Sequence, residues 1–205
     1  MAGRRELLEI LAAAREIGLL GPGPIEAHLD HTAAWAGALG DPPASFLDLG
    51  SGGGVPGLVL ARAWPGARGV LLDSRSRSVG FLSDALATLG LADRIEVVEG
   101  RAEAEGREAR LREGFPLVVA RGFAAPPVTA ECASAFLAVG GRLSVSEPPG
   151  GDPARWPEDG LARLGLGPAE TLRVDEASFV VIQKVQPLDE RWPRRVGRPG
   201  HRPIW

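Results

Sequence analysis

Residues 46–57 read Phe46-Leu47-Asp48-Leu49-Gly50-Ser51-Gly52-Gly53-Gly54-Val55-Pro56-Gly57. The apolar start of this stretch is typical of a buried strand, and the glycines that follow are typical of a tight turn. The apolar residues that resume at Leu58 suit either a helix or another buried strand. We interpret the stretch as a strand, a glycine turn and a helix. An α/β sheet holds a nucleotide-like cofactor with this arrangement, at the carboxyl edge of its strands.

The glycine spacing separates the possible cofactors. The dinucleotide pattern G-x-G-x-x-G fits from Gly52, but it places Pro56 where the helix should begin. The phosphate loop G-x-x-x-x-G-K-[S/T] requires a lysine that is absent here. The pattern D-x-G-x-G-x-G fits from Asp48 to Gly54, and it is that of class I methyltransferases, which bind S-adenosylmethionine. A glycine-rich loop without a ligand is the alternative.

Composition limits the other possibilities. The chain has 205 residues, enough for one domain with a small appendage, and its 44% hydrophobic and 24% charged residues are ordinary for a soluble globular protein. A formal charge of −3 does not indicate a general nucleic-acid binder. The single cysteine, Cys132, excludes an internal disulfide and a multi-cysteine metal cluster. His28 and His31 share a predicted helix face without a third ligand nearby, so we expect no metal site.

The sequence also predicts where the protein works. Charged residues interrupt the apolar N-terminal positions, so we expect no signal peptide. The chain contains no uncharged apolar run near the roughly 18 residues that a membrane span needs. We therefore expect a cytoplasmic protein.

Hydrophobic periodicity predicts an alternation of strands and helices. The expected strands are 45–49, 70–73, 95–98, 116–120, 142–146, 171–174 and 178–185, the last two forming a hairpin. The expected helices are 4–20, 25–39, one from the glycine turn to 63, 76–89, most of 101–113, and 126–138. This order predicts a mostly parallel, doubly wound seven-stranded sheet with an antiparallel edge. The predicted division is a helical cap (1–41), a methyltransferase domain (42–186) and a tail (187–205).

Two strand ends carry polar residues that suit a nucleoside. Asp73 ends the second predicted strand, where an acid would bind the ribose hydroxyls, although an exposed acid at a strand end is the alternative. Gly100-Arg101-Ala102-Glu103 follows the third predicted strand, and this position suits contacts to an adenine ring.

The tail is rich in proline and arginine. Its arginines stand beside Trp192 and Trp205, a combination that suits phosphate pairing and base stacking. We therefore expect RNA contact through Arg191, Arg194, Arg195, Arg198 and Arg202. A tail that only packs along the surface is the alternative.

Together these motifs resemble the GidB/RsmG family, bacterial methyltransferases that modify guanine N7 in small-subunit ribosomal RNA. The resemblance runs from 46 to 185, and the tail looks like that of actinobacterial members. Its specific parts are the stretch 48–57, Leu72-Asp73-Ser74, Phe81-Leu82, Gly100-Arg101-Ala102-Glu103 and Ala120-Arg121-Gly122-Phe123-Ala124. It implies a Rossmann-like class I methyltransferase fold, S-adenosyl-L-methionine as cofactor, and ribosomal small-subunit RNA or the assembled small subunit as partner.

The resemblance and the turn pattern imply roles for individual residues. The expected catalytic residues near the target base are Arg121 and Arg77. The expected cofactor-binding residues are Asp48, Gly50, Ser51, Gly52, Val55, Asp73, Ser74, Ala102, Glu103 and Arg121.

The chain departs from the family on the substrate side. Arg77 and Glu147 each stand where the family usually has a lysine, and Ala177 and Ser178 replace a usual arginine. Because Glu147 reverses a charge where RNA contact is expected, two alternatives stay open. One is a small-molecule methyltransferase on the same fold, and the other is a paralogue that binds the cofactor without turnover.

Overall fold

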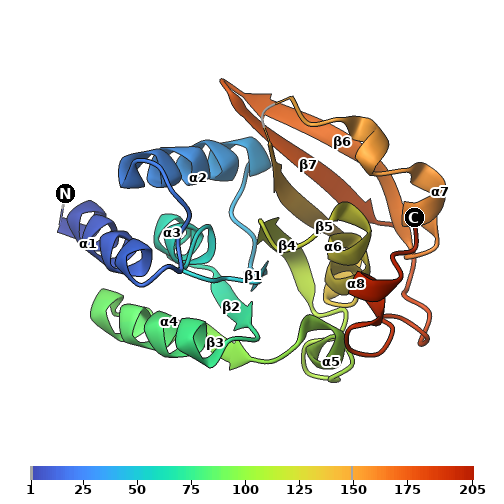
Figure 1. The fold of residues 1–205 in the computed structure, drawn as a ribbon, viewed down its shortest axis with the longest axis horizontal. Coiled ribbons are helices and arrows are strands. Elements are labelled where there is room, and N and C mark those ends of the chain that lie inside the picture. Colours follow the sequence, from blue (N-terminus) through green and yellow to red (C-terminus); the bar gives the residue numbers. More distant parts are fainter. Residues whose placement is uncertain (1, 149) are drawn as a thin grey trace.

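The computed structural model describes residues 2–148 and 150–205 and contains one seven-stranded sheet (Figure 1). The strand order is β3-β2-β1-β4-β5-β7-β6. Strands β1 to β5 pair in parallel, while β7 is antiparallel to both β5 and β6. This confirms the mostly parallel sheet with an edge hairpin. The strands are β1 (Ser45–Leu49), β2 (Arg68–Asp73), β3 (Ile95–Glu99), β4 (Phe115–Arg121), β5 (Leu137–Glu147), β6 (Leu166–Val174) and β7 (Ala177–Lys184).

Helices cover both faces of the sheet, as Figure 1 shows. On one face lie α1 (Ala2–Glu16), α2 (Ile25–Leu39), α3 (Gly57–Ala63) and α4 (Ser76–Leu89). On the other face lie α5 (Ala102–Glu105), α6 (Pro126–Ser134), α7 (Glu158–Ala162) and α8 (Arg198–His201), together with the short 3-10 helix η1 (Pro153–Arg155). None of the helices described is long and apolar enough to cross a membrane.

Side-chain alternation along β1 divides the core into two layers. Phe46 packs under α1 to α4, whereas Leu47 and Leu49 pack under α5 to α7. Trp35 of α2 ties the first layer to the sheet, because its indole Nε1 donates to Ser144 Oγ at 2.7 Å and its ring stacks on Phe179 at 5.1 Å between centroids. The predicted cap therefore shares a core with the sheet.

The sequence overestimated the extent of three helices. The helix predicted over 4–20 ends at Glu16. The predicted helix 126–138 ends at Ser134, because Leu137 pairs with Phe115 and begins β5. Apolar residues suit a helix and a buried strand equally well, and here strand pairing prevailed. Within 101–113 only α5 is an α-helix, and the arginines that follow it donate to the backbone of the C-terminal tail.

The tail, residues 187–205, packs against the second layer. Leu188 and Trp192 are buried in that core. Leu188 N–H donates to Glu113, whose carboxylate also pairs with the fully buried Lys184 at 3.1 Å. Arg112 donates to the Trp192 carbonyl at 2.9 Å. The first half of the tail therefore packs against the protein, and RNA contact through its arginines stays a prediction.

Candidate functional site

The glycine turn after β1 lies at the carboxyl edge of the sheet and is fixed by backbone contacts. Gly50 N–H and Ser51 N–H both donate to the Leu72 carbonyl, at 2.8 and 3.0 Å. Gly50 has a φ of +76°, which glycine adopts without steric cost. A Cβ there would lie 2.6 Å from the Phe123 ring. The turn therefore requires glycine for its conformation and for the close approach of Phe123.

Asp48 lies beneath this turn and holds the start of α3. Its Oδ2 accepts from Gly57 N–H at 2.9 Å, and a Cβ at Gly57 would lie 2.4 Å from the same oxygen. Among the described residues, Asp48 Oδ1 is buried without a hydrogen-bond partner. Burial raises the pKa of Asp48 to about 7, although Ser51 and the Gly57 N–H oppose the shift. Asp48 thus stabilises the turn from below.

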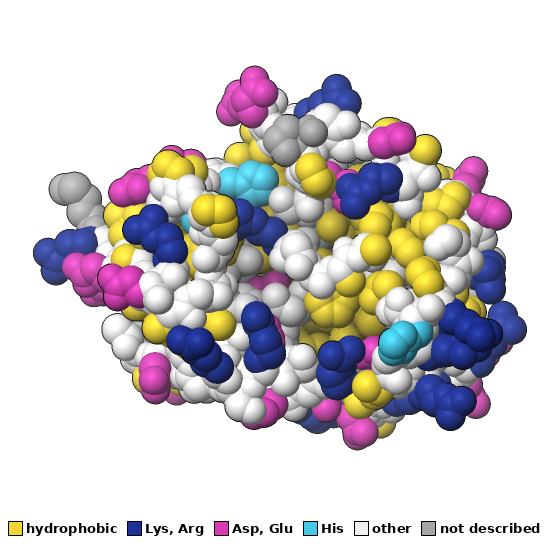
Figure 2. Space-filling model, in the orientation of Figure 1, with side chains coloured by type: hydrophobic (Ala, Val, Ile, Leu, Met, Phe, Trp, Pro, Cys, Tyr) yellow, Lys and Arg dark blue, Asp and Glu magenta, His cyan; other side chains and the backbone are white. Residues whose placement is uncertain are grey.

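A cavity of about 730 Å³ opens where β1, β2 and β3 end. Its volume is in the range of small-molecule and cofactor sites. Figure 2 shows a hollow with an apolar floor and basic side chains on either side. Five of the predicted cofactor residues line the cavity, namely Gly50, Asp73, Ser74, Ala102 and Glu103.

Asp73 is 5% exposed at the end of β2. Its Oδ2 accepts from Gly52 N–H at 2.8 Å, and its Oδ1 accepts from Arg75 N–H at 2.9 Å. Each carboxylate oxygen has two acceptor sites. Oδ1 uses both, because it also accepts from Arg75 Nε at 3.3 Å, so Oδ2 is the oxygen that can still accept from a ligand hydroxyl. With the apolar wall of Leu72, Ala102 and Val128 nearby, this donor and acceptor set fits the ribose and adenine of S-adenosylmethionine.

Glu103 is also buried at this edge. Its Oε1 accepts from Gly197 N–H of the tail at 2.9 Å and from Arg101 Nη2 at 3.3 Å. Burial alone would raise the pKa of Glu103, but these hydrogen bonds outweigh it, so the pKa lies below its usual value. The carboxylate therefore stays charged at neutral pH and connects the cavity wall to the tail.

The other predicted residues have different positions. Asp48, Ser51, Gly52 and Val55 belong to the turn but do not line the cavity. Arg77 is exposed in the first turn of α4, whereas Arg75 lines the cavity and pairs with Asp73 at 3.3 Å. The Arg75 contact was missed because nothing in the sequence pattern distinguishes it from Arg77.

Arg121, at the end of β4, faces a second region. Its Nη2 donates to His28 Nδ1 of α2 at 2.8 Å. Burial and the nearby Arg121 charge lower the pKa of His28, so this imidazole is neutral and can accept the bond. Arg121 lines two cavities, of about 330 and 460 Å³, on either side of Ser146 and Glu147. The smaller one shares Gly122, Phe123 and Ala124 with the cofactor-sized cavity.

Glu147 is not an unpaired anion. Its side chain is 3% exposed and forms an ion pair with Arg155 of η1. Arg155 therefore supplies a cation beside the position where the resemblance led us to expect a lysine. No spacing in the sequence predicted Arg155 as the partner of Glu147. Among the residues described, no group of three or more His, Cys, Asp or Glu could hold a metal ion.

The tail arginines do not share one environment. Arg194 forms a paired contact with Glu131 of α6, while Arg195, Arg198 and Arg202 are exposed. Trp192 is 4% exposed, and Arg191 and Arg194 lie over its ring. The Trp192 ring is therefore buried against the protein, and RNA contact by the tail stays a prediction.

Comparison with known proteins agrees with this geometry. The family model GidB, rRNA small subunit methyltransferase G, matches residues 25–146. A ribosomal RNA small subunit methyltransferase G of Moorella thermoacetica is 38% identical over 170 residues, which cover 80% of this chain and 70% of the relative. The protein of the same name from Roseiflexus castenholzii is 36% identical over 173 residues, which cover 80% of this chain and 73% of the relative.

Solved structures show the same fold at lower identity. Cofactor-bound Rv0187 from MTB has a TM-score of 0.61 and 22% identity, with 88% of this chain and 89% of that chain covered. PigF with SAH has a TM-score of 0.60 and 22% identity, with 75% of this chain and 54% of that chain covered. The family model matches more than half of the chain, and the chain covers more than two thirds of both relatives. The chain therefore belongs to the GidB family, rRNA small subunit methyltransferase G, and is an S-adenosylmethionine-dependent enzyme.

Proposed function

We propose that this enzyme methylates N7 of a guanine in small-subunit ribosomal RNA, in the cytoplasm, with that RNA or the assembled small subunit as its partner. The target base would reach the methyl group through the cavity beside Arg121. The supporting observation is that this cavity and the cofactor-sized cavity share Gly122, Phe123 and Ala124. A base beside Arg121 therefore lies next to whatever occupies the larger cavity.

S-adenosylmethionine, when bound, supplies a methyl group on a positively charged sulfur. We assign the ribose hydroxyls to Asp73, with Ser74 beside it, and the adenine to the wall around Ala102 and Glu103. The predicted turn residues Asp48, Ser51, Gly52 and Val55 would act through the conformation of the turn, which presents Gly50 to the cavity. None of these residues needs to move a proton.

The target base needs positioning more than acid–base chemistry. N7 of guanine already carries an acceptor lone pair, so no protein group has to remove a proton before the methyl group is transferred. A guanidinium commonly donates to guanine O6, and we assign this role to Arg121. Its contact to the neutral His28 fixes its direction. Positioning of this kind accounts for large rate effects.

The RNA backbone would be bound by exposed arginines. We propose Arg195, Arg198 and Arg202 as the main phosphate contacts, because these side chains are exposed. Arg191 and Arg194 would contribute less, since one lies over Trp192 and the other pairs with Glu131. Arg77, exposed on α4, would reach phosphate and not the base.

The test is methyl transfer from labelled S-adenosylmethionine to small ribosomal subunits that lack the N7 mark. We expect label on one guanine, and none on the small-molecule fraction of the same cells. Label on a metabolite and none on RNA would favour the small-molecule alternative. Binding of S-adenosylhomocysteine without a methylated product from either fraction would favour the paralogue without turnover.

A further inference from the structure

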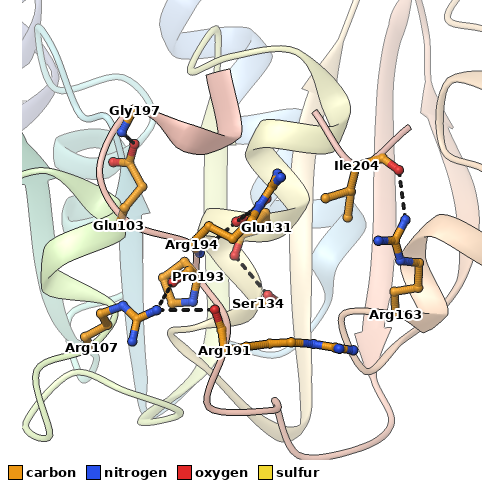
Figure 3. A network of polar contacts seen from close by, with 10 residues as sticks. All are labelled: Glu103, Arg107, Glu131, Ser134, Arg163, Arg191, Pro193, Arg194, Gly197 and Ile204. Carbon is orange, nitrogen blue, oxygen red and sulfur yellow. Dashed lines mark hydrogen bonds and ion pairs between the residues drawn. The ribbon is translucent and has the colours of Figure 1, made fainter. Parts of the chain in front are cut away.

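The second half of the tail is held by two buried carboxylates of the α5–α6 layer (Figure 3). Glu131 is fully buried on α6. Its Oε2 accepts from Arg194 Nη2 at 2.6 Å, while its Oε1 accepts from Arg194 Nε at 3.0 Å and from Arg194 N–H at 2.8 Å. Glu103 accepts from Gly197 N–H three residues later. We call Glu103, Glu131, Arg194 and Gly197 the tail latch.

The latch is stronger than a surface ion pair. Paired guanidinium–carboxylate contacts of this kind are among the strong hydrogen bonds in proteins. Removing one partner of a buried pair also leaves the other charge without compensation. Arg107 adds contacts from the loop after α5, donating to the carbonyls of Arg191 and Pro193. The position of the tail is therefore fixed by specific partners, and not by apolar contact alone.

The latched segment forms part of the wall of the large cavity. Gly197, Gly200 and His201 line that cavity together with Glu103 and Cys132. Glu103 thus has two roles, since its side chain borders the cavity while its Oε1 holds the tail. Anything that occupies this end of the cavity contacts a wall whose position depends on the latch.

We propose that residues 194–201 form a wall of the S-adenosylmethionine site at its adenine end, and that tail docking and cofactor binding stabilise each other. This rests on the proposed assignment of the cavity to the cofactor. Linkage then requires a reciprocal effect: if docking the tail improves cofactor affinity by some factor, cofactor binding must favour the docked tail by the same factor. Glu131 and Arg194 are positioning residues in this scheme.

Cys132 offers a reporter of tail opening. It is the only cysteine in the chain, it is 1% exposed, and it lines the cavity beside the latch. Burial, with the nearby Glu103 and Glu131 charges, raises the pKa of its thiol. Because the thiol is almost fully buried, opening of the tail wall should speed its reaction with a thiol reagent.

The experiment compares the full-length wild type with Arg194→Gln, and uses Arg5→Gln as the matched control. Arg5 is an exposed arginine on α1, in the layer on the opposite face of the sheet. Binding of S-adenosylhomocysteine is measured by calorimetry, and labelling of Cys132 is measured with and without that ligand. We expect Arg194→Gln to weaken binding at least tenfold and to speed labelling at least tenfold, with Arg5→Gln at wild-type values.

A double variant distinguishes loss of the latch from the cost of a buried unpaired carboxylate. Glu131→Gln with Arg194→Gln removes both charges. Part of the stability that Arg194→Gln alone loses should therefore return, while cofactor binding stays weaker than in the wild type. Faster Cys132 labelling together with unchanged ligand affinity in Arg194→Gln would overturn the proposal.

Hydrogen exchange of the wild type gives an independent test if the variants do not fold. We expect S-adenosylhomocysteine to slow amide exchange across residues 188–201. Ligand binding without any slowing of exchange in this segment would contradict the proposed wall. If the wild type bound no S-adenosylhomocysteine at all, the cofactor assignment itself would fail. Loss of RNA methylation with binding and exchange effects intact would instead count only against the proposed function.

Discussion

The carboxyl edge of the sheet has two halves that are built differently. The cofactor half, after β1 to β3, is shaped mainly by backbone groups, such as the N–H groups of Gly50 and Ser51 on the Leu72 carbonyl. The target half, after β4 and β5, is shaped by side chains from distant segments. Arg121 meets His28 there, and Glu147 meets Arg155. The first half depends on chain conformation, and the second depends on charge pairing.

This difference indicates where substitutions can be tolerated. A backbone-built site changes only when glycines or strand ends change, and these follow a recognisable spacing. A side-chain pair can exchange its partners as long as the charges balance. Arg155 beside Glu147 is such a case, because a cation is retained near the end of β5 although the residue in the strand is an acid.

The largest effect should come from Arg121→Ala in the target half. Loss of base positioning should lower kcat about 100- to 1,000-fold, while S-adenosylhomocysteine affinity changes little. Single-turnover methylation and calorimetry measure the two quantities. Arg68→Ala, at the amino end of β2, is the control. Equal losses in kcat and cofactor affinity would mean that the two halves are not separable.

In the cofactor half, Asp73→Asn should weaken S-adenosylhomocysteine binding about 10- to 100-fold, because hydrogen bonds to a charged acceptor contribute about 1.5–3 kcal/mol. Asp84→Asn on the exposed side of α4 is the matched control. Calorimetry measures the affinity. Wild-type affinity in Asp73→Asn would exclude the ribose contact that we assign to this carboxylate.

The pair in the target half can be tested by reversing it. Glu147→Lys alone should lower the free energy of unfolding by about 1–2 kcal/mol, a range discounted for solvent because the Arg155 side chain is 39% exposed. Glu147→Lys with Arg155→Glu should recover most of this loss. Urea unfolding gives the values. If the double variant were as unstable as the sum of the single variants, the charges would not be coupled.

The smallest effect concerns Asp48 and pH. Its folded-state pKa is raised to about 7 by burial, so the folded protein binds a proton that the unfolded chain releases at lower pH. The stabilisation is greatest under acid conditions and is lost as pH rises towards 7. Between pH 6 and pH 7 the titration of Asp48 should lower the free energy of unfolding by about 1 kcal/mol.

Asp48→Asn should remove that part of the pH dependence, which urea unfolding at several pH values would detect. The carboxyl resonance of Asp48 can be titrated directly as a check. A resonance that titrates below pH 5 would contradict the raised pKa.

The sequence predicted the turn and the strand ends of the cofactor half correctly, for a physical reason. Glycine positions, strand ends and the acid of Asp73 are local features, and the sheet alone determines how they meet. The bounds of β1 and α2 also agree with their patterns, as does the helix that begins at Ser76. Family membership, the fold and the cofactor class followed from these features.

The target half and the tail could not be predicted in the same way. The contacts of Arg121 to His28 and of Arg194 to Glu131 join residues far apart in the chain. An arginine in the sequence has the same appearance whether it will bind phosphate or a buried carboxylate. The basic tail therefore suggested RNA contact throughout, although part of it is used internally.

Lys184 has a practical consequence. It is the only lysine of the chain, it is fully buried, and burial lowers its pKa although Glu113 opposes the shift. Amine-reactive acylating reagents can therefore modify this side chain only when the end of β7 opens to solvent. The rate of acylation at this lysine then reports how often the packing of α6, β5 and Glu113 around it opens, without any engineered label.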